Sequence, residues 1–395
     1  MGLRWRVYAG PATAPSSQVP SVALRSDNGA PITAAQPMTE SHLFDAGKLT
    51  AAVHAIVKAG GSSDREATMV ATNLVEANLR GHDSHGVGMV PRYIDALKEG
   101  GLKVEAHVEI RLDGGATLSL DGVEGYGQVI GREAMELGIE RARRHGVCVV
   151  GLAHSHHLGR IGHWAEQVTA QGLVSIHFVN VLSRPIVAPF GGRDARFGTN
   201  PFCVGVPRAG TDPIVLDFAT SKIAQGKTRV AHNKGVPIAP DTIIDNHGNP
   251  TTDPRFTVIE PYGALLTFGE HKGSGLALIC ELLGGALAGG DTARPVTDGR
   301  RRVLNSMLSI LIDPLKLGGA EHLAAEVESF VAWYAASPPG AGVDHVKVAG
   351  EPERLRKAER LAGGIPIDTV TWNEIVAAGA KVGLERAELT RLAGA

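Results

Sequence analysis

"TLSLDGVEGYGQVIGREAMELG", residues 117–138, is the stretch that decides between two fold classes for this chain. A strand-like segment leads into Gly125, Gly127 and Gly131 and then into a helical segment, as in a turn that binds phosphate. The glycine spacing has one residue too many for the dinucleotide fingerprint, and the next apolar strand, residues 147–155, ends without the acidic residue expected about 20 positions on. The stretch therefore argues against a Rossmann domain and favours another α/β arrangement.

Helix and strand patterns alternate on both sides of this stretch. Residues 41–61 and 64–81 space their apolar residues by three and four, which predicts two helices, the second capped by Ser62 or Ser63. Further helices are predicted over 127–146, 159–172, 272–289 and 322–337, and strands over 107–122 (a hairpin), 147–155, 173–180, 201–208, 213–221 and 302–314. We expect an α/β chain in which the two chain ends form a helical layer around a middle sheet.

The expected domain organisation follows from these patterns. Residues 38–110 form an N-terminal helical segment, residues 111–300 a sheet domain, and residues 301–395 a segment that returns to the helical layer. Residues 1–37 are rich in Ser, Pro, Ala and Gly and have too few large apolar residues to form a core, which predicts a disordered tail. A transit peptide, or a start at Met38, are the alternatives for this segment.

Composition excludes several function classes. The formal net charge of the 395 residues is −2, and the charges are interspersed, so the chain has no basic face for nucleic acid or a membrane surface. No apolar run reaches the roughly 18 residues that a membrane-spanning helix needs. Cys148, Cys203 and Cys280 lie far apart without metal-ligand spacing, which is typical of thiols in a reducing compartment. We expect a soluble, cytoplasmic protein.

Four polar stretches interrupt the apolar elements. "GHDSHGVGMVPRY" (81–93) follows a predicted helix, "AHSHHLGRIGH" (153–163) and "LDFATSKIAQGKTR" (216–229) follow strands, and "GEHKGSG" (269–275) opens a helix. Reacting groups in α/β proteins gather at such positions. His85, His157 and His271 are therefore the candidate acid/base and ligand-binding side chains, because glycine-rich loops bring the backbone close around them.

Metal binding is one alternative use of these histidines. His82 and His85 are three residues apart, and His154 and His157 repeat the spacing, so four imidazoles would meet if the two loops converged. A hydrolytic zinc site usually adds a glutamate base next to its ligands, and neither stretch holds one. We therefore predict no metal site.

Three further features suggest a nucleotide ligand. Gly159, Arg160 and Ile161 precede a helix and could offer backbone N–H groups and a guanidinium to a phosphate, or only cap that helix. Asp217 ends a strand and could accept from a ribose hydroxyl, orient a histidine, or cap a turn. Lys272 opens a helix, where a bound phosphate would be stabilised. A P-loop is not supported, since Gly226-Lys227-Thr228 lacks the upstream glycine.

Taken together, six ordered motifs resemble the malate/L-lactate dehydrogenase family that is unrelated to the Rossmann enzymes. They are "GHDSHGVGMVPRY", "SHHLGRIGHWAE", "RFGTNPF", "LDFATS", "GKTRVA" and "EHKG", and the resemblance covers about residues 40–392. It implies a largely antiparallel sheet, NAD or NADP as cofactor, interconversion of 2-hydroxy and 2-oxo acids, and a homodimer.

The resemblance also implies roles for particular residues. His85 would lie beside the nicotinamide with Ser84 as its neighbour, and His157 would stand at the proton-transfer position. The cofactor would also be held by Gly159, Arg160, Ile161, Val215, Leu216, Asp217, Phe218, Ala219, His271, Lys272, Asn305, Gly350 and Glu351. His154 stands where the family usually has Asn, and sequence alone does not separate His85 from His157 as the proton donor.

One departure from the family pattern concerns the substrate. Much of the family has Arg five residues after the serine of "SHG", where it could hold a substrate carboxylate, whereas this chain has Met89. The resemblance then allows a bulkier or aromatic 2-oxo acid alongside malate or lactate. Arg160, Arg184 or Arg196 could supply the carboxylate contact instead.

Overall fold

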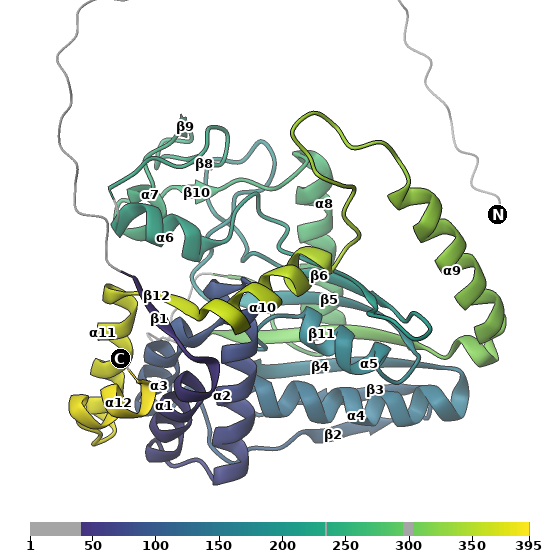
Figure 1. Ribbon diagram of the computed structural model, residues 1–395, viewed down its shortest axis with the longest axis horizontal. Helices are drawn as coiled ribbons and strands as arrows, with labels where there is room; N and C mark the ends of the chain where they lie inside the picture. Colours follow the sequence, from purple (N-terminus) through teal and green to yellow (C-terminus); the bar gives the residue numbers. More distant parts are fainter. Residues whose placement is uncertain (1–40, 234, 295–302, 395) are drawn as a thin grey trace, which may run out of the picture. The chain divides into compact units, whose positions relative to one another are not determined.

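A seven-stranded sheet forms the centre of the protein (Figure 1). The computed structural model describes residues 41–233, 235–294 and 303–394, so the predicted tail over residues 1–37 lies outside the described residues. In spatial order the strands are β2 (Glu109–Asp113), β3 (Thr117–Asp121), β4 (Val147–His156), β11 (Leu304–Ile312), β5 (Val174–Leu182), β6 (Phe202–Val206) and β7 (Ile214–Phe218). Every neighbouring pair is antiparallel except β3 and β4. The prediction of a largely antiparallel, non-Rossmann sheet is confirmed.

Helix α4 (Gly127–His145) makes the crossover that the parallel pair β3 and β4 needs. A Cβ atom at Gly127 would lie 2.2 Å from the carbonyl oxygen of His157, so the first turn of α4 packs directly on the end of β4. No phosphate fits between them. The glycines of the stretch 117–138 therefore serve close helix–strand packing instead of a phosphate turn.

The helical layer combines both ends of the described chain, as the sequence predicted. It contains α1 (Ala46–Ala59), α2 (Asp64–Leu79) and α3 (Val90–Lys98) from one end, and α11 (Thr369–Lys381) and α12 (Arg386–Ala393) from the other. One apolar core, with Ile56, Leu74 and Ile375 fully buried, spans both groups. Ser63 caps α2 by accepting from the backbone N–H of Glu66 at 3.2 Å, which is one of the two caps predicted.

The helix predicted over residues 41–61 is wrong at its start. Residues Ser41–Phe44 form β1, which pairs with β12 (Ile365–Asp368) in a two-stranded antiparallel sheet. Asp45 then caps α1 through the backbone N–H of Lys48, so the helix cannot extend further back. A pairing with residues near the other chain end overrides the local helical spacing.

A smaller lobe lies in sequence between β7 and β11 of the central sheet. It contains a three-stranded sheet of β10 (Ala264–Leu265), β8 (Ile243–Ile244) and β9 (Pro250–Thr251), with helices α6 (Gln225–Asn233), α7 (Arg255–Val258) and α8 (His271–Cys280). The helix predicted over 272–289 continues past α8 as a π-helical segment, Glu281–Leu287. Within that segment, Gly284 lies against the backbone of Phe178 in β5. The close contact is possible because glycine has no side chain.

The remaining elements lie around the sheet. They are α5 (Gly162–Thr169), the short η4 (Pro314–Lys316), α9 (Ala320–Ala335) and α10 (Glu351–Gly363). Helix α9 has no buried residue, and Figure 1 shows it set apart from the sheet. Among the described residues, no helix combines the length and the apolar character needed to cross a membrane.

Candidate active site

The stretch 81–93 folds into two short 3-10 turns, η1 (Asp83–His85) and η2 (Val87–Met89), between α2 and α3. Asn78 at the end of α2 holds both turns, because its Nδ2 donates to Asp83 and its Oδ1 accepts from the N–H of Val87, at 2.7 and 2.8 Å. Arg360 in α10 also pairs with Asp83 at 2.6 Å. The backbone that carries His85 is therefore fixed from two elements.

His85 and His157 form a stacked pair. Their ring centroids are 5.4 Å apart and their planes differ by 17°. His157 directly follows β4 and is only 8% exposed, whereas His85 is partly open to solvent. The hydroxyl of Ser84 lies 2.9 Å from Nδ1 of His85. The structure thus brings together the three residues that the sequence nominated for catalysis.

A chain of buried side chains continues from His157 into the interior. The hydroxyl of Tyr93, in α3, lies 2.7 Å from Nδ1 of His157. The amide Nε2 of Gln128, in α4, donates to that hydroxyl at 2.9 Å. Tyr93 and Gln128 are 1% and 3% exposed. The second ring nitrogen of His157, Nε2, has no hydrogen-bond partner among the described residues.

Burial controls the protonation of these groups. Enclosure of the His85 ring by protein lowers its pKa to about 4, with His82 adding to the effect and Asp217 opposing it. Burial also lowers the pKa of His157 well below its usual value, and His85, His156 and Arg92 lower it further. Burial raises the pKa of the Tyr93 hydroxyl. At neutral pH the two histidines are neutral and the tyrosine is protonated.

The other histidines of the stretch 153–163 face different partners. His154, at a φ of 50°, lies with Nδ1 3.0 Å from Oδ2 of Asp121. His156 is fully buried, and neither ring nitrogen has a hydrogen-bond partner among the described residues. Within the described ranges no group of three or more His, Cys, Asp or Glu side chains is arranged to hold a metal ion.

Arg160 and Asp217 meet at the start of α5. Oδ2 of Asp217 accepts from the N–H of Gly162, the first residue of α5, at 2.7 Å, a contact with a distant helix that the sequence did not predict. The guanidinium of Arg160 pairs with Glu166 at 2.5 Å and is almost completely buried. Its Nε atom is buried without a partner among the described residues. Both side chains lie close enough to His85 to affect its pKa.

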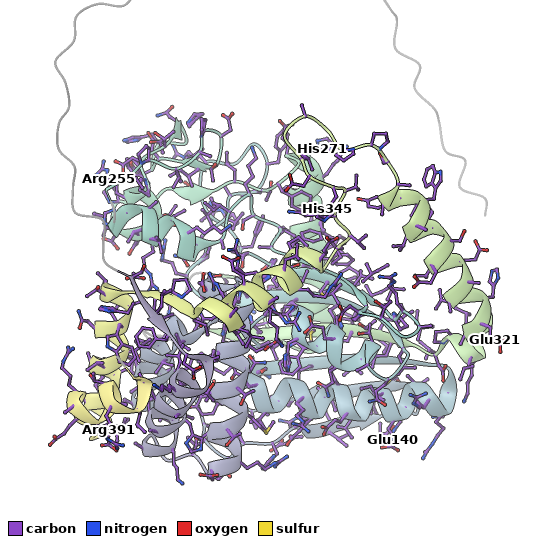
Figure 2. The ribbon with its side chains drawn as sticks, viewed as in Figure 1. Glu140, Arg255, His271, Glu321, His345 and Arg391 are labelled. Carbon is purple, nitrogen blue, oxygen red and sulfur yellow. The ribbon has the colours of Figure 1, made fainter. Side chains whose placement is uncertain are left out.

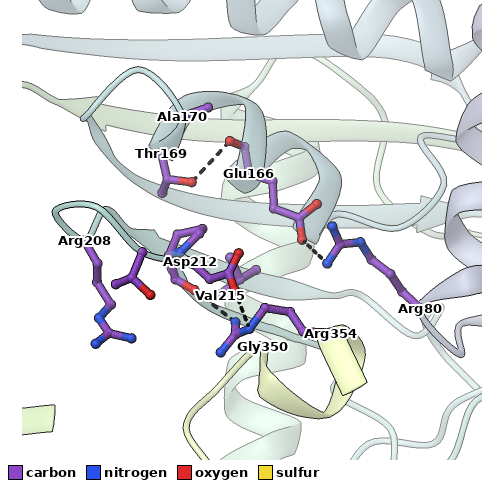
Figure 3. Close-up of a pocket in the computed structure, with 11 residues that line it drawn as sticks. Arg80, Glu166, Thr169, Ala170, Arg208, Asp212, Val215, Gly350 and Arg354 are labelled. Carbon is purple, nitrogen blue, oxygen red and sulfur yellow. Dashed lines mark hydrogen bonds and ion pairs between the residues drawn. The ribbon is translucent and has the colours of Figure 1, made fainter. Parts of the chain in front are cut away.

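A polar pocket of about 350 Å³ lies beside β7 and the start of α10 (Figure 3). Val215 and Gly350 line it, and the N–H of Val215 donates to the carbonyl of Ala349 at 3.3 Å, so two segments nominated for cofactor binding are neighbours. Its charged walls are Arg80, Glu166, Arg208, Asp212 and Arg354. The carboxylate of Glu351 already pairs with His345 at 2.5 Å, so it is only partly available for cofactor binding.

The remaining nominated residues lie on β7, α8 and β11. Leu216 and Phe218 continue β7, and the ring of Phe218 contacts Phe268, three residues before α8 begins. His271 and Lys272, the first residues of α8, are exposed, and Figure 2 marks His271 there. Asn305 is buried and its Oδ1 accepts from the N–H of Leu158 at 2.8 Å, which fixes the loop after His157.

Sequence reasoning missed Tyr93, Gln128, Arg92 and Arg229. Arg92 precedes Tyr93 in α3 and forms no hydrogen bond or ion pair with the described residues, although protein surrounds it enough to lower its pKa, with Arg229 and Arg184 lowering it further. Tyr93 and Arg92 belong to the quoted stretch 81–93, so proximity in sequence to His85 was the available signal. Gln128 carried no such signal.

The fold and the site together define the class of protein. The fold is mixed α/β with a largely antiparallel sheet, and the site holds a stacked histidine pair at the end of a central strand. The chain matches the model of the malate/L-lactate dehydrogenase family over residues 44–376 and belongs to that family. It is therefore a dehydrogenase of the malate/lactate type that acts on 2-hydroxy acids, in a family of NAD(P)-dependent enzymes.

Individual relatives agree with this assignment. The chain is 48% identical over 349 residues to hydroxycarboxylate dehydrogenase B of Escherichia coli K12, which covers 88% of this chain and 96% of that one. It is 42% identical over 308 residues to an L-lactate dehydrogenase of Cupriavidus necator, covering 78% and 88% of the two chains. A solved structure assigned as a malate/lactate dehydrogenase of E. coli superposes with a TM-score of 0.85 at 47% identity, covering 89% and 98%.

Proposed function

We propose that this chain is an NAD- or NADP-dependent enzyme that interconverts 2-hydroxy and 2-oxo carboxylates, with His157 exchanging the proton at the oxygen on C2. The observation that carries the proposal is the stacked pair of His85 and a buried, neutral His157 held at Nδ1. A positioned imidazole of this kind contributes about 10²–10⁴-fold to a rate through proton transfer. His85, with Ser84 bonded to it, lies beside the nicotinamide in this proposal.

Residues around the end of β7 would hold the cofactor. Gly350 has a φ of 90°, and a Cβ atom there would lie 3.3 Å from the N–H of Val215, so glycine keeps this wall of the pocket open. The buried Nε of Arg160 lacks a partner among the described residues and is a donor for a ligand oxygen. When bound, NAD or NADP supplies the hydride acceptor or donor. The segments Gly159–Ile161 and Val215–Ala219, with His271, Lys272, Asn305 and Gly350–Glu351, complete the proposed contacts.

The proton exchange follows from the charge state of His157. In the oxidation direction Nε2 accepts the proton of the C2 hydroxyl, and burial keeps the imidazole neutral and ready to act as a base. In the reduction direction His157 must first be protonated. The carboxylate of a bound 2-oxo acid favours the cation and so raises the pKa of His157 when substrate binds.

Three arginines support a binding site for the substrate carboxylate. Arg229 in α6 lies beside Gly88 of η2, with Nη2 3.8 Å from the position of a Cβ atom there, and its Nη1 makes only a long contact of 3.9 Å with Glu374. Arg184 donates to the carbonyl of Thr257 at 3.2 Å and stacks on Tyr262 at 3.6 Å. Arg92 has no carboxylate partner among the described residues. Their mutual repulsion is relieved by an anion, which favours a carboxylate at this place.

The other two arginines nominated for the carboxylate contact are less suitable. Arg160 already pairs with Glu166, and Arg196 pairs with the exposed Asp194 at 3.1 Å. Met89 is partly buried against the helical core. We therefore propose that Arg92, Arg184 and Arg229 hold the substrate carboxylate, in place of the arginine that much of the family has at position 89.

The domain organisation supports a closure around the substrate. We retain the division into an N-terminal helical segment over 38–110, a cofactor-binding sheet domain over 111–300, and a C-terminal segment over 301–395 that returns to the helical layer after it supplies β11 to the central sheet. The site is assembled from both parts, because His85 and Tyr93 come from the helical layer and His157 directly follows β4 of the sheet domain. Closure of the two parts would exclude water from the hydride path.

We also propose a homodimer formed through α9. Phe330, Trp333 and Tyr334 of this helix are 61%, 74% and 45% exposed, and their rings pack on one another. Such a large apolar group on one helix is typical of a protein interface. The occupant that the family suggests is a second copy of the chain. We propose no nucleic-acid or membrane partner, and a cytoplasmic location that suits the three free, buried thiols.

The test is a comparison of His157→Gln with His85→Gln. With NADH or NADPH, the parent enzyme is screened for reduction of pyruvate, oxaloacetate and hydroxyphenylpyruvate, and the best substrate is kept. His157→Gln should lower the single-turnover rate by roughly 10²-fold or more while the fluorescence titration of NADH changes little. His85→Gln should also weaken NADH binding. A His157→Gln enzyme at the parent rate, with His85→Gln inert at intact affinity, would assign the proton to His85.

Two other functions remain distinguishable by measurement. A zinc-dependent hydrolase built on the clustered histidines would contain stoichiometric zinc and lose its activity on chelation. A nucleotide-binding module would bind NADH in the titration and turn over none of the 2-oxo acids. We expect neither result, since the family is one of dehydrogenases.

A further inference from the structure

The proposed proton exchange requires one particular tautomer of His157. A neutral imidazole carries one proton, on either Nδ1 or Nε2. To accept a proton from a substrate hydroxyl at Nε2, His157 must carry its own proton on Nδ1. Nδ1 lies 2.7 Å from the hydroxyl of Tyr93, so the tyrosine decides which tautomer is present.

Two hydrogen-bond arrangements fit the same heavy atoms. In the first, Gln128 Nε2 donates to the Tyr93 oxygen, the Tyr93 O–H donates to Nδ1, and His157 carries its proton on Nε2. In the second, the amide of Gln128 is turned over, Tyr93 O–H donates to the amide oxygen, and Nδ1–H of His157 donates to the tyrosine oxygen. Side-chain amides have nearly the same shape in both orientations, so either orientation places its N and O atoms at the same two positions.

Gln128 is buried, and its amide has the Tyr93 hydroxyl as its partner in either arrangement. In the first, Oε1 of Gln128 is buried and has no partner among the described residues. In the second, Oε1 accepts from the tyrosine, whose hydroxyl burial keeps protonated by raising its pKa, and the amide nitrogen takes the position without a partner. Only the second arrangement leaves Nε2 of His157 as a free base, so the proposed proton exchange selects it.

We infer that Tyr93 and Gln128 are positioning residues that set the tautomer of His157 and stabilise its protonated form. Tyr93 and Gln128 touch neither substrate nor cofactor in this scheme. Their effect passes through Nδ1, because the tyrosine oxygen accepts Nδ1–H both before and after Nε2 gains its proton. This inference rests on the proposed function of His157 as the acid/base group.

Three substitutions separate this role from simple packing. Tyr93→Phe removes the hydroxyl that accepts from Nδ1, so the imidazolium is less stable and its pKa falls. Gln128→Glu offers only acceptors, so the Tyr93 O–H must donate to it and Nδ1–H to the tyrosine. Gln128→Leu offers no acceptor, so the Tyr93 O–H turns to Nδ1 and holds the proton of His157 on Nε2, the tautomer that cannot act as a base.

Tyr126→Phe is the matched control. Tyr126 is also fully buried and its ring lies 5.8 Å from that of Tyr93, yet its hydroxyl bonds neither His157 nor Gln128. The variant therefore removes the same group from the same core without changing the hydrogen bonds that connect Gln128 and Tyr93 to His157. We expect its rate and pH profile to match the parent enzyme.

The experiment measures kcat for oxidation against pH, with the hydroxy acid that corresponds to the best 2-oxo acid. Tyr93→Phe should lower kcat by about 10-fold or more and move the acidic limb down by about one pH unit, the size of a hydrogen bond to a charged group. Gln128→Glu should keep most of kcat and move the limb up. Gln128→Leu should lower kcat at least as far as Tyr93→Phe. KM should change little in all three.

A second measurement is independent of turnover. In full-length enzyme with ¹⁵N-labelled histidine, the ring-nitrogen signals of His157, assigned by their loss in His157→Gln, should report a proton on Nδ1 in the parent and on Nε2 in Gln128→Leu. If Tyr93→Phe does not fold, the two Gln128 variants carry the comparison. The inference is overturned if His157→Gln is inert while Tyr93→Phe and both Gln128 variants share the rate, pH limb and tautomer of Tyr126→Phe. A fully active His157→Gln would instead overturn the proposed function.

Discussion

Replacement of Gly127 by alanine tests how α4 positions His157. An alanine Cβ at this first residue of α4 would lie 2.2 Å from the carbonyl oxygen of His157 and 2.7 Å from that of His156. Cβ atoms do not approach other heavy atoms within 3.0 Å. Both contacts are with backbone, which no side-chain rotation can relieve, so the end of β4 and the start of α4 must separate by roughly 1 Å.

The size of the effect follows from this displacement. A shift of about 1 Å in a catalytic group can cost about 10²-fold in rate, and overpacking a core costs typically about 1–3 kcal/mol of stability. We therefore expect Gly127→Ala to fold with a lowered Tm and to lose about 10²-fold in kcat. Cofactor affinity should change less, because only Gly159–Ile161 among the proposed cofactor contacts adjoin the displaced segment, whereas those on β7 and α10 lie on other elements.

The assay combines thermal unfolding with single-turnover kinetics. Gly363→Ala is the control, since no atom lies within 4 Å of a Cβ at that position in α10. It should retain the parent rate. A Gly127→Ala enzyme that loses stability but keeps the parent kcat would refute the reasoning, because His157 would then tolerate movement of the strand that carries it.

Further predictions concern substrate choice, pH and assembly. Met89→Arg should shift kcat/KM toward oxaloacetate, through a new bidentate carboxylate contact; unchanged ratios across the acid panel would place residue 89 outside the pocket. Burial lowers the pKa of His177 to about 3, below its unfolded value near 6.5, so stability is lost as pH falls below 6.5. Between pH 7.5 and 5.0, the free energy of unfolding measured in urea should therefore fall by about 2 kcal/mol less for His177→Gln than for the parent. Trp333→Glu should convert a dimer to a monomer by light scattering, and a parent that is monomeric contradicts the proposed interface.

Local signals in the sequence were sufficient for most elements of the fold. The cap at Ser63 and the apolar spacing that follows it define α2, because capping and helical periodicity act within one or two turns. The alternating residues around 107–122 define the hairpin of β2 and β3. Glycine-rich stretches after such elements identified His85 and His157, since a permissive backbone beside a reactive side chain is itself a local feature.

Only the tertiary structure decided the features that join distant segments. Tyr93 reaches His157 across 64 residues of sequence and Gln128 reaches Tyr93 across 35, so no local pattern announces either contact. Strand β1 exists because residues near the other end of the chain pair with it. Helical spacing describes which face of a segment is apolar, but not which partner covers that face or which polar atom is left to bond. Those outcomes depend on packing across the whole chain, and the surroundings of His157 are among them.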